Sequence, residues 1–216
     1  MKRCERMLSL ALSALALALP ARAQDDQAAE LAKKLANPVA SLISVPLQYN
    51  DDTYGGANDG ASVSRLVIQP VIPFSLNKDW NLISRTLIPL MKQEDIPAGT
   101  EESGLGDILT TLYLSPVKPT AGGWIWGVGG AFLLPTATEA LGGKQWAVGP
   151  TALALKQEKG WTYGALVTQT WSVAGDDSRD KVNMLFLQPF AGYTTKEGWN
   201  YTAWTETSYY WDRPSG

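Results

Sequence analysis

Nine stretches of strand length, joined by alternately short and long connections, dominate the sequence and constrain its fold most strongly. They span residues 40–50, 62–76, 80–91, 105–116, 124–135, 146–157, 161–173, 183–195 and 199–211. Nearly all match or exceed the ~9 to 11 residues with which a tilted strand crosses a membrane. From residue 40 onward, no run of 18 residues is free of charges and turn signals, so the pattern does not indicate a membrane helix there.

The connections fall into two classes. The short or compact ones are residues 77–79, 117–123, 158–160 and 196–198. The longer ones are polar, glycine-rich or acidic and span residues 51–61, 92–104, 136–145 and 174–182. Short turns on one side and long loops on the other are typical of an antiparallel outer-membrane β-barrel, with the short turns in the periplasm. Soluble β-sandwiches also have unequal loops, so alternation alone does not separate the two classes.

Aromatic residues mark the ends of the predicted strands. In the stretch 199–211, Trp199 and Tyr201 lie at one end of a face, and Tyr209 and Trp211 at the other. A lipid-facing strand that crosses two interfacial aromatic girdles has this arrangement. Tight turns that lead directly into a tryptophan recur elsewhere in the chain. The predicted girdle residues are Trp80, Trp124, Trp126, Trp161, Trp199, Tyr201, Tyr209 and Trp211.

The stretch 124–135 is uncharged and contains Gly127, Gly129 and Gly130. These glycines do not form a nucleotide-binding loop, because they lie within a strand. Their setting favours close packing or bending of the barrel wall.

The N-terminal region precedes the predicted barrel domain, residues 40–216. Residues 1–23 have a basic start, an apolar run shorter than the ~20 residues of a membrane span, and a small-residue cleavage site, which together predict a cleaved secretory signal. Within residues 24–39, a helical pattern over 25–37 stops at Pro38. This helix either rests on the periplasmic end of the barrel or enters its lumen as a plug.

The odd number of strands is unexpected, because bacterial single-chain barrels are closed and have an even number. Residues 212–216 have the composition of the start of another long loop. We therefore expect the C-terminal part of the barrel to be missing from this sequence. The other explanation is that one stretch is misassigned and the barrel closes with eight or ten strands.

Four segments resemble a family of bacterial outer-membrane proteins regarded as transporters: Leu-Ala-Asn-Pro-Val-Ala-Ser-Leu-Ile-Ser-Val-Pro-Leu-Gln-Tyr-Asn at 35–50, Gln-Pro-Val-Ile-Pro-Phe at 69–74, Gly-Leu-Gly-Asp-Ile at 104–108 and Val-Gly-Pro-Thr at 148–151. The family is grouped with MetA-pathway phenol-degradation proteins and is sometimes labelled neuromedin U. The resemblance implies a barrel of about 12 antiparallel strands, about nine of them present here, and a loosely assigned transport role without catalytic residues. The closing strands with a terminal aromatic residue, usual in such proteins, are absent.

The residue content excludes most catalytic chemistry. The chain has no histidine, and its one cysteine, Cys4, lies in the predicted signal. Barrel lipases, acyltransferases and deacylases generally need a histidine base, and only a weak oxygen-ligand calcium site could be assembled. The acidic loops favour solvation and contact with cations and lipopolysaccharide over an aspartate protease. We therefore predict no enzymatic activity, no cofactor and no metal centre, and the net charge of -3 does not indicate nucleic acid.

Four charged residues fall within the predicted strands: Arg65, Arg85, Asp107 and Glu206. A lipid-facing arginine near the midplane costs about 2–4 kcal/mol, so these side chains should face the lumen. They form either a salt-bridged core that fills a narrow barrel or a constriction that selects solutes. The predicted polar neighbours are Gln69, Thr168 and Gln188.

These features predict an exported outer-membrane β-barrel, in contact with lipids and lipopolysaccharide, through which a small solute passes down its gradient. The apolar or aromatic nature of that solute is implied by the resemblance alone. The alternative is a non-conducting barrel that acts as a structural or surface-interaction module through its long loops. A soluble periplasmic β protein is the third possibility.

Overall fold

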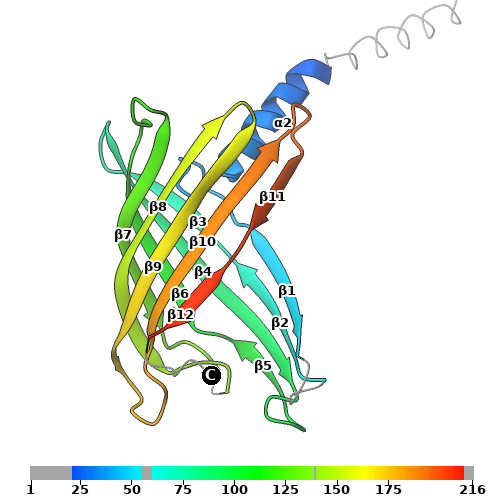
Figure 1. The fold of residues 1–216 in the computed structure, drawn as a ribbon, viewed down its shortest axis with the longest axis vertical. Coiled ribbons are helices and arrows are strands. Elements are labelled where there is room, and N and C mark those ends of the chain that lie inside the picture. The colour runs from blue at the N-terminus through cyan, green and yellow to red at the C-terminus, as the bar shows by residue number, and fades with distance from the viewer. Residues whose placement is uncertain (1–20, 55–59, 139, 212–216) are drawn as a thin grey trace, which may run out of the picture.

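The protein is an antiparallel β-sheet that curls into a half-barrel, as Figure 1 shows. The computed structural model describes residues 21–54, 60–138 and 140–211. All strand pairs are antiparallel, and the sheet follows the order β1-β2-β4-β6-β7-β8-β9-β10-β11. The predicted all-β fold class is therefore confirmed.

The described chain contains one helix and twelve strand segments. They are α2 (Ala21–Leu35), β1 (Leu47–Thr53), β2 (Ser62–Ile68), β3 (Val71–Ser75), β4 (Trp80–Glu94), β5 (Glu101–Leu105), β6 (Ile108–Pro116), β7 (Trp124–Leu134), β8 (Gln145–Glu158), β9 (Trp161–Gly175), β10 (Asn183–Thr194), β11 (Asn200–Trp204) and β12 (Thr207–Tyr210).

The sheet has nine rows, each formed by one strand or by two successive strand segments. Three of these rows are interrupted once. β2 and β3 pair with successive parts of β4, β5 and β6 do so from the other side of β4, and β11 and β12 both pair with β10. The interruptions fall at Gln69-Pro70, Gly106-Asp107 and Thr205-Glu206. Joining the interrupted segments yields nine rows, which correspond to the nine predicted stretches.

The first predicted strand is displaced along the chain. Residues 40–46 contribute one isolated bridge, between Ser44 and Val71, whereas the ladder with β2 runs from Leu47 to Thr53. Pro38 and Pro46 lack a backbone donor, which disfavours a continuous ladder over this stretch. The prediction of a strand over 40–50 and a loop from 51 is therefore wrong by several residues.

Short turns and long loops lie at opposite ends of the half-barrel (Figure 1). We call the end with the β8–β9 and β10–β11 turns the turn end, and the opposite end the loop end. α2 lies at the turn end, where Gln157 Nε2 donates to the carbonyl oxygen of Lys33 at 2.8 Å. A Cβ atom placed on Gly198 would lie 2.9 Å from the Cβ atom of Ala28, so the helix also contacts the next turn.

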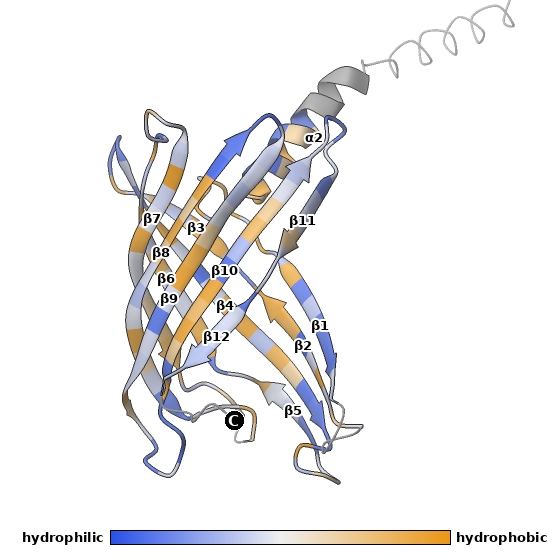
Figure 2. Cartoon of the chain, viewed as in Figure 1, coloured by the Kyte–Doolittle hydropathy of each residue, from blue (hydrophilic) through white to orange (hydrophobic). Residues whose placement is uncertain are grey.

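The convex face of the half-barrel is apolar along its middle. Residues paired in an antiparallel ladder share a face, so the ladders assign each side chain to one side of the sheet. Apolar residues alternate with polar ones along β8, β9 and β10 in Figure 2. From β4 to β10, the charged residues of the convex face lie near the two ends of the strands: Lys92, Glu94, Glu101, Lys156 and Glu158.

Two bands of exposed aromatic side chains flank this apolar zone. At the turn end, Trp124 packs edge-on against Tyr163, Trp161 lies 5.3 Å from Tyr193 between ring centroids, and Trp80 contacts Trp126. At the loop end lie Trp146, Trp171, Tyr209 and Trp211. The sequence patterns did not single out Tyr163, Tyr193, Trp146 and Trp171.

The spacing of the two bands can be measured along β9. Trp161 and Trp171 lie ten positions apart on the same face of β9. At a rise of about 3.3 Å per residue they are separated by about 33 Å along the strand. A tilt of about 40° reduces this to about 25 Å, the height of the apolar band of outer-membrane barrels.

The hydrophobic core lies inside the curl, towards the turn end. It contains the fully buried Ile83, Tyr113 and Leu155, with Val71, Leu153 and Leu166 around them. Val39 reaches this cluster from the segment after α2 and is 5% exposed. Asn81 Nδ2 donates to Ser41 Oγ at 2.8 Å, which adds a polar contact to the same segment. The helix thus rests across the turn end, while the following residues enter the curl.

Truncation of Tyr113 should destabilise the fold strongly. Its ring is fully buried, and its hydroxyl lies 3.0 Å from Thr151 Oγ1. Tyr113→Ala should lower the free energy of unfolding by about 3–5 kcal/mol, because it leaves a large cavity. Tyr113→Phe should cost about 1 kcal/mol, since Thr151 retains a 2.7 Å contact with Thr168. Denaturant unfolding in detergent micelles measures both, and equal losses would contradict the packing role of the ring.

Candidate functional site

A cavity of about 210 Å³ occupies the concave face on the loop side of the core. Side chains from β1, β2, β4, β6, β7, β9 and β10 line it, together with Glu206 between β11 and β12. Six of the seven predicted lumen residues line this cavity: Arg65, Gln69, Arg85, Thr168, Gln188 and Glu206. The sheet curls around them, so residues more than a hundred positions apart share one space. We call it the central cavity.

A hydrogen-bond chain of side chains runs along one wall of the central cavity. Arg85 Nη2 donates to Gln69 Oε1 at 2.9 Å, and Gln69 Nε2 donates to Gln48 Oε1 at 3.0 Å. Gln48 Nε2 then donates to Asn50 Oδ1 at 3.1 Å. The chain holds the Arg85 guanidinium in place from β1 and from the β2–β3 junction. Gln48 and Asn50 were not among the predicted site residues, although their alternate positions in a strand indicate a shared face.

Arg65 lies beside this chain but is bonded less fully. Its Nη2 atom is 3.6 Å from Asp52 Oδ2, which is an ion pair beyond ordinary hydrogen-bond distance. Its Nε atom is buried and has no hydrogen-bond partner among the described residues. A buried donor without a partner is costly, so this atom is available to an acceptor that enters the cavity.

The opposite wall of the central cavity is mainly apolar. Leu109, Leu133, Leu166, Met184 and Phe186 contribute to it from β6, β7, β9 and β10. Hydroxyl groups interrupt this wall at Thr111, Tyr113 and Thr168, but they bond to neighbours within the wall. The cavity is therefore amphipathic, because its cations come from β2 and β4 and most of its apolar side chains come from β6, β7, β9 and β10.

Glu206 supplies the acidic group of the central cavity. It interrupts the last row of the sheet and accepts a hydrogen bond from Gln188 Nε2 at 2.9 Å. Arg85 is bonded to Gln69 and Arg65 is paired with Asp52, so these contacts differ from the predicted pairing of two bases with two acids. Asp52 was predicted in an outer loop, and the extension of β1 to Thr53 brings it beside Arg65.

Asp107 lies outside the central cavity, contrary to its predicted place in the lumen. It occupies the break between β5 and β6, where its carboxylate accepts hydrogen bonds from Ala137 N at 3.2 Å and Gly143 N at 2.8 Å. The ladder is interrupted at Gly106-Asp107, so the side chain is free to turn towards the β7–β8 loop. Its role is to hold that loop.

Arg85 also lies at the boundary between the central cavity and the turn end. It also lines two smaller cavities of about 150 and 180 Å³. Residues of the segment after α2, including Ala36 and Pro38, line these two cavities. The guanidinium therefore lies between the central cavity and the segment that fills the turn end.

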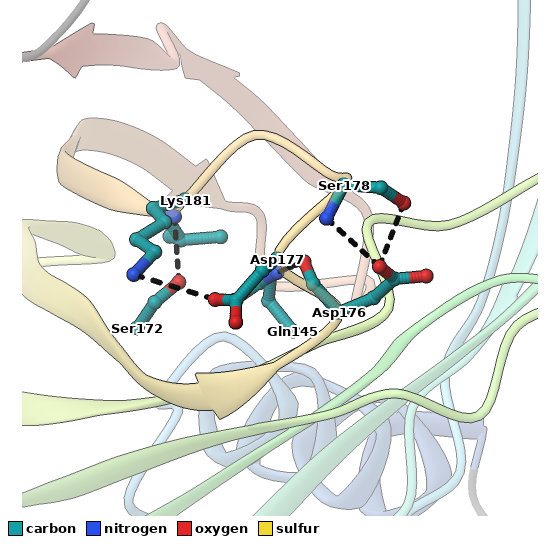
Figure 3. A network of polar contacts seen from close by, with 7 residues as sticks. Gln145, Ser172, Asp176, Asp177, Ser178 and Lys181 are labelled. Atoms are coloured by element: carbon teal, nitrogen blue, oxygen red, sulfur yellow. Dashed lines mark hydrogen bonds and ion pairs between the residues drawn. The ribbon is translucent and has the colours of Figure 1, made fainter.

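The acidic β9–β10 loop is held by hydrogen bonds and an ion pair between its own residues (Figure 3). Asp176 Oδ1 accepts hydrogen bonds from Ser178 Oγ at 2.7 Å and from Ser178 N at 2.9 Å, and these bonds lower the pKa of its carboxyl group. Lys181 lies 3.7 Å from Asp177, and Gln145 Nε2 donates to the carbonyl oxygen of Asp176. Among the described residues, no group of three or more acidic, histidine or cysteine side chains is arranged to hold a metal ion.

Comparisons with known proteins identify no relative: no family model, no curated protein and no solved structure matches this chain. Across residues 21–54, 60–138 and 140–211, no helix is both long enough and apolar enough to span a membrane. The central cavity and the surface around it are therefore interpreted from their geometry.

Proposed function

We propose that the protein is an outer-membrane β-barrel that passes a small solute passively down its gradient. The observation that carries the proposal is the contrast between the two faces of the sheet. The convex face is apolar between two aromatic bands, and the concave face surrounds a cavity lined by arginine, glutamine and glutamate. A polar interior behind an apolar wall is the arrangement of barrels that conduct solutes through a lipid bilayer.

The energetic cost of exposing charge to lipid supports a membrane location. Arg65 and Arg85 both lie on the concave face, where neither contacts the apolar zone. The same residues on the convex face would cost about 2–4 kcal/mol each near the midplane. An exposed apolar surface that extends over the six rows from β4 to β10 also exceeds the patches that soluble monomers usually carry.

Arg85 is suited to select solutes. It lies between the central cavity and the two cavities beside the segment after α2. A fixed cation at a narrow point favours anions and disfavours cations. Gln69 holds the guanidinium by a 2.9 Å hydrogen bond, which limits the positions that it can adopt.

The sequence patterns complete the proposal. The predicted signal at 1–23, most of which lies outside the described residues, directs export, and the two bands contact outer-membrane lipids and lipopolysaccharide. The resemblance to the outer-membrane transporter family supports the same role. Nothing in the central cavity pairs a nucleophile with a base, so the proposal includes no catalysis.

A non-conducting barrel is the second candidate, and the filled turn end favours it. Val39 packs into the core there, and Ser41 is bonded to Asn81. In that case the polar contacts of the cavity stabilise the wall, and the long loops contact the surroundings. Cell fractionation tests the assumption that both candidates share, because a pool that stays soluble without detergent would contradict a membrane barrel.

Planar-bilayer conductance and liposome uptake separate the two candidates. The intact protein should produce discrete current steps with a preference for anions. Arg85→Gln should lower the permeability of anions relative to cations several-fold, because it removes the cation at the narrow point. Arg179→Gln, which makes the same charge change in the β9–β10 loop, should leave this ratio unchanged. Absence of current and uptake, with Arg65→Ala and Glu206→Ala equally silent, would overturn the channel proposal.

A further inference from the structure

The central cavity has the features of a binding site for a small molecule with one anionic end and one apolar end. We propose that its ligand is a small amphipathic monocarboxylate, whose carboxylate bonds to Arg65 and whose apolar body lies against Met184 and Phe186. This inference rests on the proposed function, since it names the class of solute that the barrel passes.

The unpaired donor of Arg65 points to an acceptor. Its Nε atom is buried without a hydrogen-bond partner among the described residues, although the side chain lines the cavity. Arginine binds carboxylates through two parallel N–H···O bonds, and Nε with a terminal nitrogen forms one such pair. A carboxylate would therefore satisfy an atom that the protein leaves unsatisfied.

The charges of the cavity favour an anion. Arg65 and Arg85 line it from β2 and β4, and Glu206 is the acidic residue that lines it. Glu206 projects from the far edge of the sheet and accepts a hydrogen bond from Gln188 at 2.9 Å. Asp52 reaches Arg65 only at 3.6 Å and does not line the cavity. Two arginines and one glutamate thus line the cavity, and both arginines come from the side of β2 and β4.

The remaining surface favours an apolar body of limited size. Leu109, Leu166, Met184 and Phe186 line the cavity from β6, β9 and β10. An engineered apolar cavity of about 150 Å³ holds benzene, which has six heavy atoms. The 210 Å³ found here has room for about eight heavy atoms on the same scale, the size of hexanoate. A doubly charged anion or a sugar would leave polar groups against the apolar wall.

Hexanoate is the probe for this site, with the full chain in lipid nanodiscs and empty nanodiscs as the blank. Calorimetric titration should show saturable binding of hexanoate, and binding of hexan-1-ol and hexylamine should be at least tenfold weaker. Arg65→Gln should weaken hexanoate binding at least tenfold, and Arg65→Lys should weaken it less. Arg179→Gln, outside the cavity, should leave binding unchanged.

These measurements test the monocarboxylate site and the channel separately. Equal affinity for hexanoate and hexan-1-ol, or unchanged hexanoate binding in Arg65→Gln, would overturn the monocarboxylate site. Anion-selective current without hexanoate binding would overturn this inference but not the channel. Hexanoate binding that depends on Arg65, in a protein that passes neither current nor hexanoate, would retain the site and overturn the transport role.

Discussion

In the proposed channel, a disulfide between residues 39 and 127 is expected to hold the turn end closed. A Cβ atom placed on Gly127 would lie 3.4 Å from Val39 Cγ1, the atom that a cysteine Sγ would replace, so the two positions are close enough for a disulfide. In a background with Cys4→Ser, the Val39→Cys/Gly127→Cys variant should lose nearly all current when oxidised and recover it after reduction. Planar-bilayer recording before and after addition of a thiol measures the change.

The physical reason lies in how the segment after α2 is held. Val39 is buried in the core, but its segment joins the wall through few backbone hydrogen bonds: two between Ser44 and Val71, and one from Gln69 N to the carbonyl oxygen of Pro46. Burial of a valine side chain contributes about 1.5–3 kcal/mol, an amount that thermal fluctuation overcomes at intervals. We therefore expect brief openings in the unmodified protein, which a covalent bond would suppress.

Three controls accompany the crosslink. Val39→Cys alone and Gly127→Cys alone should not respond to oxidation. Removal of residues 25–44 should have the opposite effect and increase the current, because it empties the turn end. Unchanged current in the oxidised double variant, with the disulfide confirmed by mass spectrometry, would show that this segment does not gate the barrel.

Replacement of Gly129 by alanine should disrupt the pairing of β6 and β7. A Cβ atom at this position would lie 1.7 Å from the carbonyl oxygen of Leu112 on β6, which is far inside van der Waals contact. The obstacle is backbone, so relief requires β6 and β7 to separate where Gly129 pairs with Tyr113. Gly129→Ala should abolish the folded band in an assay of heat-modifiable electrophoretic mobility.

Gly130 provides the matched control, one residue away on the opposite face. A Cβ atom there would meet only ring atoms of Phe132, at 3.1 Å, and a side chain can move by a few tenths of an ångström. Gly130→Ala should therefore fold to nearly the same yield as the unmodified chain. Equal folding of Gly129→Ala and Gly130→Ala would contradict the close approach of β6 and β7.

Local patterns were sufficient for the architecture. Alternation along β11 and β12 placed Tyr201 and Tyr209 on the convex face, because side chains in a strand project to opposite faces in turn. Short turns that lead into tryptophan indicated the position of one aromatic band, because each hairpin returns the chain to the same level of the sheet. These features depend on residues that are close in the sequence.

Contacts between distant residues required the tertiary structure. The composition favoured ion pairs among the mid-strand charges, but the register of neighbouring strands brings Asp52 to Arg65 and Gln69 to Arg85. Asp107 lies outside the predicted site because the ladder breaks beside it. The residue types alone do not indicate this break.

The sequence by itself determined the all-β class, the nine rows, the two kinds of connection and most of the face that each strand presents. These properties follow from the two-residue period of a strand and from the residues that form turns. Only the tertiary structure decided which side chains meet, such as Val39 with the core and Gln48 with Gln69. Such contacts depend on register and curvature, which are set by the packing of the whole sheet.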